Sequence, residues 1–191
     1  PRPRRLSPLL HPTLRPRGET TWHKSSHMHP SPRCWAEIDL SALRENLAWI
    51  RHRVGPGVRI MTVVKADAYG HGLVPAAQAA KAGGAEWLGV ALLDEALAPR
   101  AAGIEGPVLA WLLGMDEPWA DALDADIDLS VSALWLLDSI AAAARSGGRT
   151  ARIHLKVDSG LGRSGAAQSD WAELVGAARR AVAATGQPEQ P

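Results

Sequence analysis

The sequence contains no phenylalanine, one tyrosine and one cysteine among its 191 residues. The lone cysteine, Cys34, excludes a framework of disulfides within the chain and is compatible with a reducing compartment, so we expect a cytoplasmic protein. No apolar run approaches the roughly 18 residues that a membrane-spanning helix needs, and no secretory signal core of about 7–15 apolar residues is present. The formal net charge of +1 gives no indication of nucleic-acid binding. We therefore expect neither a membrane nor a nucleic acid among the partners.

The charge that is present is unevenly distributed. Residues 1–33 contain seven Lys and Arg against the single acid Glu19, a balance of +6, and the remainder contains 14 basic and 19 acidic residues, a balance of −5. The first segment is also rich in Pro and Ser and has no apolar period, which predicts a disordered basic extension. Three of its histidines, His23, His27 and His29, leave a metal site open as an alternative, but we assign no metal to the chain.

From residue 34 to residue 186, short apolar runs alternate with amphipathic segments. We expect strands at 35–40, 58–64, 87–92, 108–112, 127–131 and 151–157, and helices at 41–54, 73–82, 94–102, 118–123, 134–144 and 170–184. Ser41 is the predicted cap of the first helix. Repeated βα units predict a parallel sheet with right-handed crossovers in one α/β domain, followed by a polar tail at 187–191. The alternation alone does not distinguish a barrel from a doubly wound sheet.

Lys65 directly follows the apolar strand at 58–64 and opens a polar, glycine-flanked loop. Desolvation lowers the pKa of a lysine, and a neutral amine forms a Schiff base with an aldehyde. Pyridoxal phosphate is the commonest biological aldehyde used in this way. Tyr69 lies four residues further on, and Gly70 and Gly72 allow close approach of the backbone to a ligand. The alternative is an ordinary loop with a surface lysine.

A second polar loop, residues 156–165, follows the last predicted strand. In a barrel this loop and Lys65 face the same mouth, where active sites lie. Its glycines fit the dinucleotide pattern G-x-G-x-x-G, but the acid that this pattern needs about 20 residues later is absent, since Arg179 and Arg180 stand there. Alternatively, the guanidinium of Arg163 suits a carboxylate, which it can bind with two parallel hydrogen bonds.

The two loops together resemble the signatures of alanine racemases. The first is Val-Val-Lys-Ala-Asp-Ala-Tyr-Gly-His-Gly at 63–72, with Asp67 where many members have Asn, and the second is Lys-Val-Asp-Ser-Gly-Leu-Gly-Arg-Ser-Gly at 156–165. The segments at 36–40 and 92–97 also match, and for the latter we predict a role in helix start and packing. The resemblance implies that Lys65 carries pyridoxal phosphate, that Tyr69 hydrogen-bonds its phosphate, and that Arg163 binds the substrate carboxylate and the side of the cofactor that bears the phenolic oxygen. It also implies that Lys156, where carbamylated, orients Arg163; the alternative is a plain lysine paired with Asp158.

The same resemblance implies a fold and a reaction. The fold is a (β/α)8 TIM-type barrel, truncated here to about five βα units and without the C-terminal β domain. The reaction is the interconversion of L- and D-alanine, which supplies D-alanine for peptidoglycan, in a homodimer whose second base is a tyrosine of the C-terminal domain. We therefore expect this chain to be inactive alone. The alternatives are a non-catalytic pyridoxal phosphate-binding protein, a racemase of broader specificity and, from the glycine loop, a nicotinamide-dependent dehydrogenase.

Overall fold

The computed structural model describes residues 20–21 and 36–185. The predictions for residues 1–33, including the three histidines, and for residues 187–191 lie outside the described residues, except that Thr20–Thr21 (β1) pairs antiparallel with Ile38–Asp39 (β2). The other strands are β3 (Met61–Val63), β4 (Trp87–Val90), β5 (Val108–Ala110), β6 (Asp128–Val131) and β7 (Ile153–Leu155). The helices are α1 (Leu40–Val54), α2 (Lys65–Gly70), α3 (Leu73–Ala82), α4 (Leu93–Ala101), α5 (Trp119–Asp124), α6 (Leu134–Gly147) and α7 (Gln168–Thr185).

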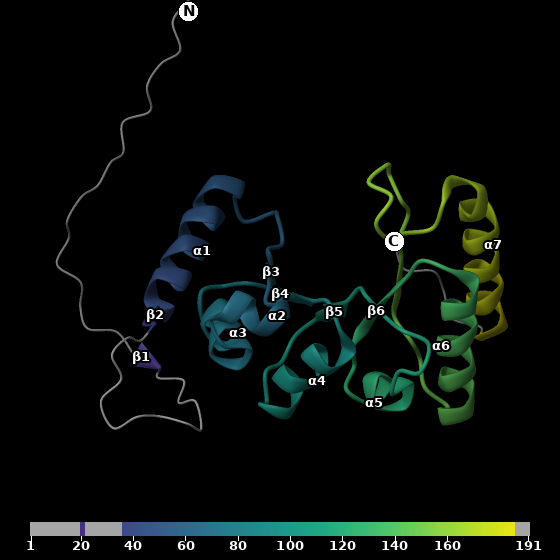
Figure 1. The fold of residues 1–191 in the computed structure, drawn as a ribbon, viewed down its shortest axis with the longest axis horizontal. Helices are drawn as coiled ribbons and strands as arrows, with labels where there is room; N and C mark the ends of the chain where they lie inside the picture. Colours follow the sequence, from purple (N-terminus) through teal and green to yellow (C-terminus); the bar gives the residue numbers. More distant parts are fainter. Residues whose placement is uncertain (1–19, 22–35, 186–191) are drawn as a thin grey trace, which may run out of the picture.

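Five parallel strands form the central sheet in the order β3-β4-β5-β6-β7, which is the order of the chain (Figure 1). Neighbouring strands pair Met61 with Trp87, Leu88 with Val108, Leu109 with Asp128 and Leu129 with Ile153. A doubly wound sheet would reverse this order part-way. The strictly sequential order therefore selects the barrel type of α/β fold over the doubly wound type, and the five strands form part of such a barrel.

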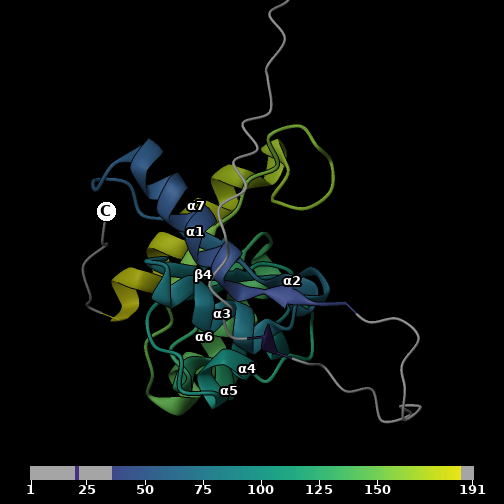
Figure 2. The same ribbon diagram turned by 90° about the vertical axis from the view of Figure 1, so that its left-hand side faces the viewer.

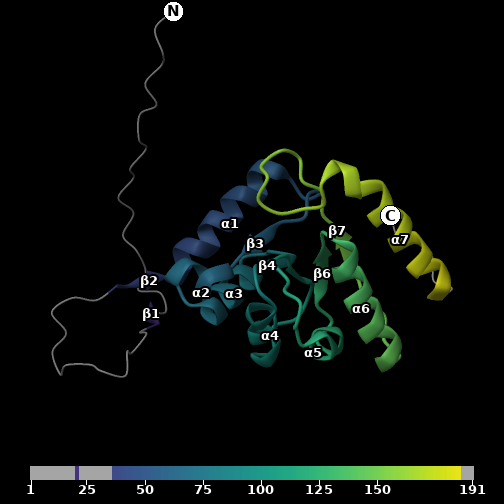
Figure 3. The same cartoon turned by 45° about the vertical axis from the view of Figure 1, so that its right-hand side comes forward.

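The helices between the strands lie in succession along one side of the sheet (Figure 3). In the three middle strands that side is apolar and fully buried, as Leu88, Val108 and Leu129 show with 0% exposure. These side chains pack against α3, α4, α5 and α6 and form the core. Alternate residues of each strand point to the opposite side of the sheet, so the core accounts for only every second residue of a strand.

The inner side of the sheet carries larger and more polar side chains. Met61 and Val63 of β3 are each 37% exposed on this side. A Cβ atom at Gly89 would lie 2.6 Å from the Trp111 ring and 2.8 Å from the Met61 sulfur, so the absence of a side chain at Gly89 makes room for the Trp111 indole inside the sheet. Inward-pointing residues at the strand ends therefore determine what the mouth of the barrel contains.

Helix α1 packs on α3 and lies at the β3 end of the sheet, as the view onto that end shows (Figure 2). Its N-cap is Asp39, whose Oδ1 accepts hydrogen bonds from Ser41 N at 3.0 Å and Ala42 N at 3.1 Å. The prediction of Ser41 as the cap was wrong, because the carboxylate of Asp39, two residues earlier, accepts from the free N–H groups. Gly55 ends the helix as predicted. None of the helices among the described residues has the length and apolarity to cross a membrane.

Candidate active site

The segment after β3 is a short left-handed turn. Ala66, Asp67, Ala68 and Tyr69 all have φ between 52° and 56°, whereas residues of this kind prefer a negative φ. The left-handed conformation costs about 1–2 kcal/mol for each non-glycine residue, so the four residues together cost about 4–8 kcal/mol. The sequence predicted a loop here. The strained turn replaces that loop, and it determines where the side chains of Lys65 and Tyr69 point.

Two carboxylates hold the left-handed turn. Asp67 Oδ1 accepts a hydrogen bond from Leu73 N at 2.6 Å, at the start of α3. Glu95, on α4, accepts from Ala66 N at 2.6 Å through Oε1, and from Ala91 N and Leu92 N at 2.9 and 3.0 Å through Oε2. Glu95 was predicted to serve helix start and packing. It does serve the helix start, but its contact with the turn was not predicted, because no pattern in the sequence joins the two segments.

Lys65 and Tyr69 lie on the same turn. The Lys65 amine is 5.3 Å from the centre of the Tyr69 ring, which is a cation–π distance. Lys65 is half-buried and Tyr69 is 61% exposed, so the amine and the phenol both reach the carboxyl-end mouth of the sheet. The two side chains come together because they are four residues apart in a single left-handed turn.

Lys156 follows β7 and points inward at the same end of the sheet. Its Nζ donates to Ser164 Oγ at 2.6 Å and to the Trp111 carbonyl at 3.5 Å, so it reaches past β6 to the end of β5. Burial, and secondarily the nearby charge of Arg163, lowers the pKa of the Lys156 amine below its ordinary value. The alternative of a lysine paired with Asp158 is not what the structure contains.

The loop after Lys156 is organised by Asp158 and Gly165. Asp158 Oδ1 accepts from Gly160 N at 2.9 Å and Gly162 N at 3.1 Å, and these two hydrogen bonds, in that order, lower the pKa of the Asp158 carboxyl. A Cβ atom at Gly165 would lie 2.6 Å from the backbone of Asp158, so the glycine is required where the loop returns to its start. Arg163 is exposed, and within the described part of the chain no hydrogen bond or ion pair joins it to Lys65.

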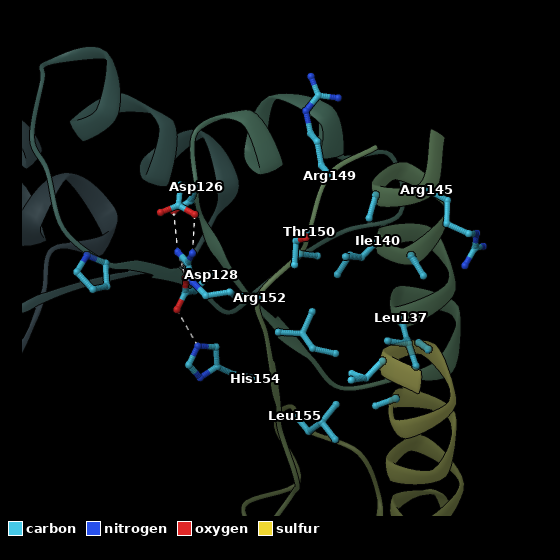
Figure 4. A pocket seen from close by; sticks show the side chains of 18 of the residues that line it. Asp126, Asp128, Leu137, Ile140, Arg145, Arg149, Thr150, Arg152, His154 and Leu155 are labelled. Atoms are coloured by element: carbon cyan, nitrogen blue, oxygen red, sulfur yellow. Dashed lines mark hydrogen bonds and ion pairs between the residues drawn. The ribbon is translucent and has the colours of Figure 1, made fainter. Parts of the chain in front are cut away.

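A large hollow lies at the opposite, amino-terminal ends of β6 and β7 (Figure 4). Leu137 and Ile140 of α6 line one wall. The other wall holds a charged cluster in which Arg152 bonds to Asp126 and Asp128, and His154 lies 2.9 Å from Asp128. None of the four candidate site residues lines this hollow. We assign the functional site to the carboxyl ends of the strands, because that mouth gathers the amine, the phenol and Lys156.

Within residues 20–21 and 36–185, no three His, Cys, Asp or Glu side chains are placed to share a metal ion. The family profile described as "Alanine racemase, N-terminal domain" matches residues 38–186. The chain belongs to the alanine racemase family. The matched range includes β2, all five parallel strands and both loops, so the alanine racemase signatures occupy the strand ends where the site lies.

Individual alanine racemases are similar to this chain over the same range. The alanine racemase of Thermobifida fusca is 52% identical over 149 residues, covering 78% of this chain and 40% of that protein. The crystal structure of the alanine racemase from D-cycloserine-producing Streptomyces lavendulae has a TM-score of 0.75 and 55% identity, covering 78% of this chain and 38% of that one. The crystal structure of the alanine racemase from Bacillus anthracis, solved with bound L-Ala-P, has a TM-score of 0.64 and 34% identity, covering 76% of this chain and 37% of that one. The chain thus spans about two fifths of the length of these relatives.

Proposed function

We propose that this chain supplies part of the active site of a pyridoxal phosphate-dependent alanine racemase. The observation that carries the proposal is the half-buried amine of Lys65 at the carboxyl end of β3, 5.3 Å from the Tyr69 ring, within the range that matches the family. The reaction is the interconversion of L- and D-alanine, and its product D-alanine serves peptidoglycan. The resemblance to racemases of this reaction supports the choice of substrate.

The residues present fit the cofactor. A primary amine that can form a Schiff base and a phenol that can donate to a phosphate oxygen lie on one turn, and both side chains reach the mouth of the sheet. Lys65 would hold the aldehyde carbon, Tyr69 the phosphate, and Arg163 the side that bears the phenolic oxygen. When bound, pyridoxal phosphate supplies the conjugated ring that accepts the electron pair left behind as the α-proton of the amino acid departs.

The chain's own groups have separate roles in this proposal. Lys65 Nζ accepts and returns the α-proton on one face of the substrate. Arg163 binds the substrate carboxylate through its fork of N–H donors. The chain's only tyrosine, Tyr69, lies on the same turn as Lys65, so it cannot also act from the opposite face. We propose that the base on that face comes from outside these five βα units, in a cytoplasmic homodimer.

Lys156 is proposed as a carbamylation site that orients Arg163. Carbon dioxide reacts with the neutral form of an amine, and the lowered pKa of the Lys156 amine makes that form more abundant near neutral pH. The carbamate would then present negative oxygen to the guanidinium of Arg163, whose charge already acts on Lys156. The hydroxyl of Ser164 is placed to donate to the same group.

The test is attachment of the cofactor to one lysine. The purified protein is mixed with pyridoxal phosphate, reduced with borohydride to make the attachment permanent, and digested for mass mapping. We expect the adduct on Lys65, its loss in Lys65→Ala, and its retention in the matched control Lys81→Ala, since the Lys81 amine donates to the Glu86 carbonyl away from the mouth. An adduct spread over several lysines, or none at all, would overturn the proposal.

A further inference from the structure

The left-handed turn that carries Lys65 is connected to a second βα unit by one side chain. Glu95 Oε1 accepts from Ala66 N, the amide directly after Lys65, and Glu95 Oε2 accepts from Ala91 N and Leu92 N at the end of β4. One carboxylate therefore receives three backbone N–H groups from two segments that are not adjacent in the chain. A glutamate that only caps α4 would need only the contacts with Ala91 N and Leu92 N.

The contact with Ala66 acts on the peptide that leads out of Lys65. Four consecutive residues with φ above 50° do not adopt that conformation by preference, so neighbouring groups must hold it. Asp67 holds the far end through Leu73 N, and Glu95 holds the near end through Ala66 N. The Lys65 side chain leaves the backbone next to this near end. Its direction therefore depends on Glu95 more directly than on Asp67.

We propose that Glu95 is a positioning residue that fixes the direction of the Lys65 amine by holding the left-handed turn to the end of β4. The function of the amine rests on the proposed racemase activity, but the contact itself does not. Glutamine cannot replace the carboxylate, because its amide nitrogen would face one of the three N–H donors. Glutamate alone among the standard residues has two acceptor oxygens at this reach.

The first measurement needs no cofactor. Amide hydrogen exchange, followed residue by residue in NMR spectra of the whole protein, reports on Ala66 N–H. We expect exchange at Ala66 to be at least tenfold faster in Glu95→Gln than in the wild type. The matched control is Asp94→Asn, one residue earlier in the same turn of α4, which keeps an oxygen for Glu95 N and does not touch the Lys65 turn. It should leave Ala66 exchange unchanged. Unchanged exchange in Glu95→Gln would overturn the proposal.

The second measurement separates positioning from capping of α4. Glycine adopts a positive φ without strain, so Ala66→Gly removes part of the need for Glu95. We expect Glu95→Gln to form the reduced pyridoxal adduct at Lys65 at least fivefold more slowly, and Glu95→Gln with Ala66→Gly to recover at least half of the rate. A purely capping role predicts no recovery, and this result would overturn the proposal. If the wild type itself forms no adduct, the racemase proposal fails, whereas Ala66 exchange still decides the role of Glu95.

Discussion

The side chain of Lys156 is partly buried and faces the charge of Arg163, which together lower the pKa of its amine. A lowered amine pKa means that the reactive neutral form appears at a lower pH. We expect the rate of labelling of Lys156 by an amine-acylating reagent to reach half of its maximum at a lower pH than that of N-acetyl-lysine amide in the same buffer. Mass mapping of the labelled peptide as a function of pH measures the rate.

The variant Arg163→Gln tests whether the charge of Arg163 contributes to the lowered pKa of the Lys156 amine. Removing the positive charge should move the labelling midpoint of Lys156 back toward the model compound by part of the difference, because burial, the larger cause, remains. A midpoint at or above that of the model compound in the wild-type protein would contradict the prediction. A midpoint that does not move in Arg163→Gln would mean that burial alone lowers the pKa.

Among single residues, the sequence was informative about identity but not about conformation. The motifs located Lys65, Tyr69 and Lys156, and the structure gathers them at the carboxyl ends of the strands. The left-handed turn could not be predicted, because Ala, Asp, Ala and Tyr all favour a negative φ and only contacts from elsewhere reverse the preference. The main such contact, from Glu95, spans 29 residues and leaves no periodic signal.

The pairing of β3, β4 and β5 depends on the missing side chain at Gly89. We expect Gly89→Ala to destabilise the protein by about 1–3 kcal/mol, since the new methyl group would lie 2.6 Å from the Trp111 ring and force it to move. Urea unfolding followed by tryptophan fluorescence measures the change. Gly57→Ala is the matched control, because nothing lies within 4 Å of a Cβ atom there. Equal stability of both variants would show that the inside of the sheet has room to spare.

Apart from β1 and α2, the order and type of the elements were predicted from the sequence, whereas the positions of their ends were predicted less well. The last predicted strand, 151–157, is a strand only over Ile153–Leu155, and the predicted strand 58–64 only over Met61–Val63. Val58 and Val157, which lie beyond the ends of these strands, are 51% and 46% exposed, so apolar character alone does not mark the paired residues. Ile50 and Val54, in the second half of α1, are 38% and 40% exposed, so the apolar residues of this helix are not buried along its whole length.

Across the whole molecule, the charged cluster at the amino-terminal ends of β6 and β7 should contribute more to stability than any exposed ion pair. Asp128 is 2% exposed and Arg152 binds it, whereas both Arg149 and its partner Asp124 are partly exposed. Arg152→Met leaves a buried carboxylate with only His154 as partner. We expect a loss of about 3 kcal/mol, at the low end of the range for broken buried pairs. The matched Arg149→Met should lose less than about 1 kcal/mol.

The difference in unfolding free energy between the wild type and Arg152→Met should also depend on pH. The hydrogen bond from Arg152 lowers the pKa of the Asp126 carboxyl, so its stabilising contribution is present above the ordinary carboxyl pKa of about 3.9 and is lost as the pH falls through the depressed value. The difference in unfolding free energy between the wild type and Arg152→Met should therefore shrink between pH 7 and pH 3. A constant or growing difference in urea titrations at the two pH values would contradict this assignment.

The contact between Ala66 and Glu95 also makes the geometry of the Lys65 turn depend on a part of the chain that is synthesised later. A growing chain exposes Lys65 about 30 residues before Glu95 has been synthesised, and until then the turn has only its local hydrogen bonds against its right-handed preference. The amine therefore acquires its final direction only when the second βα unit has docked beside the first. Until that docking, the turn that bears Lys65 lacks the hydrogen bond from Ala66 N to Glu95.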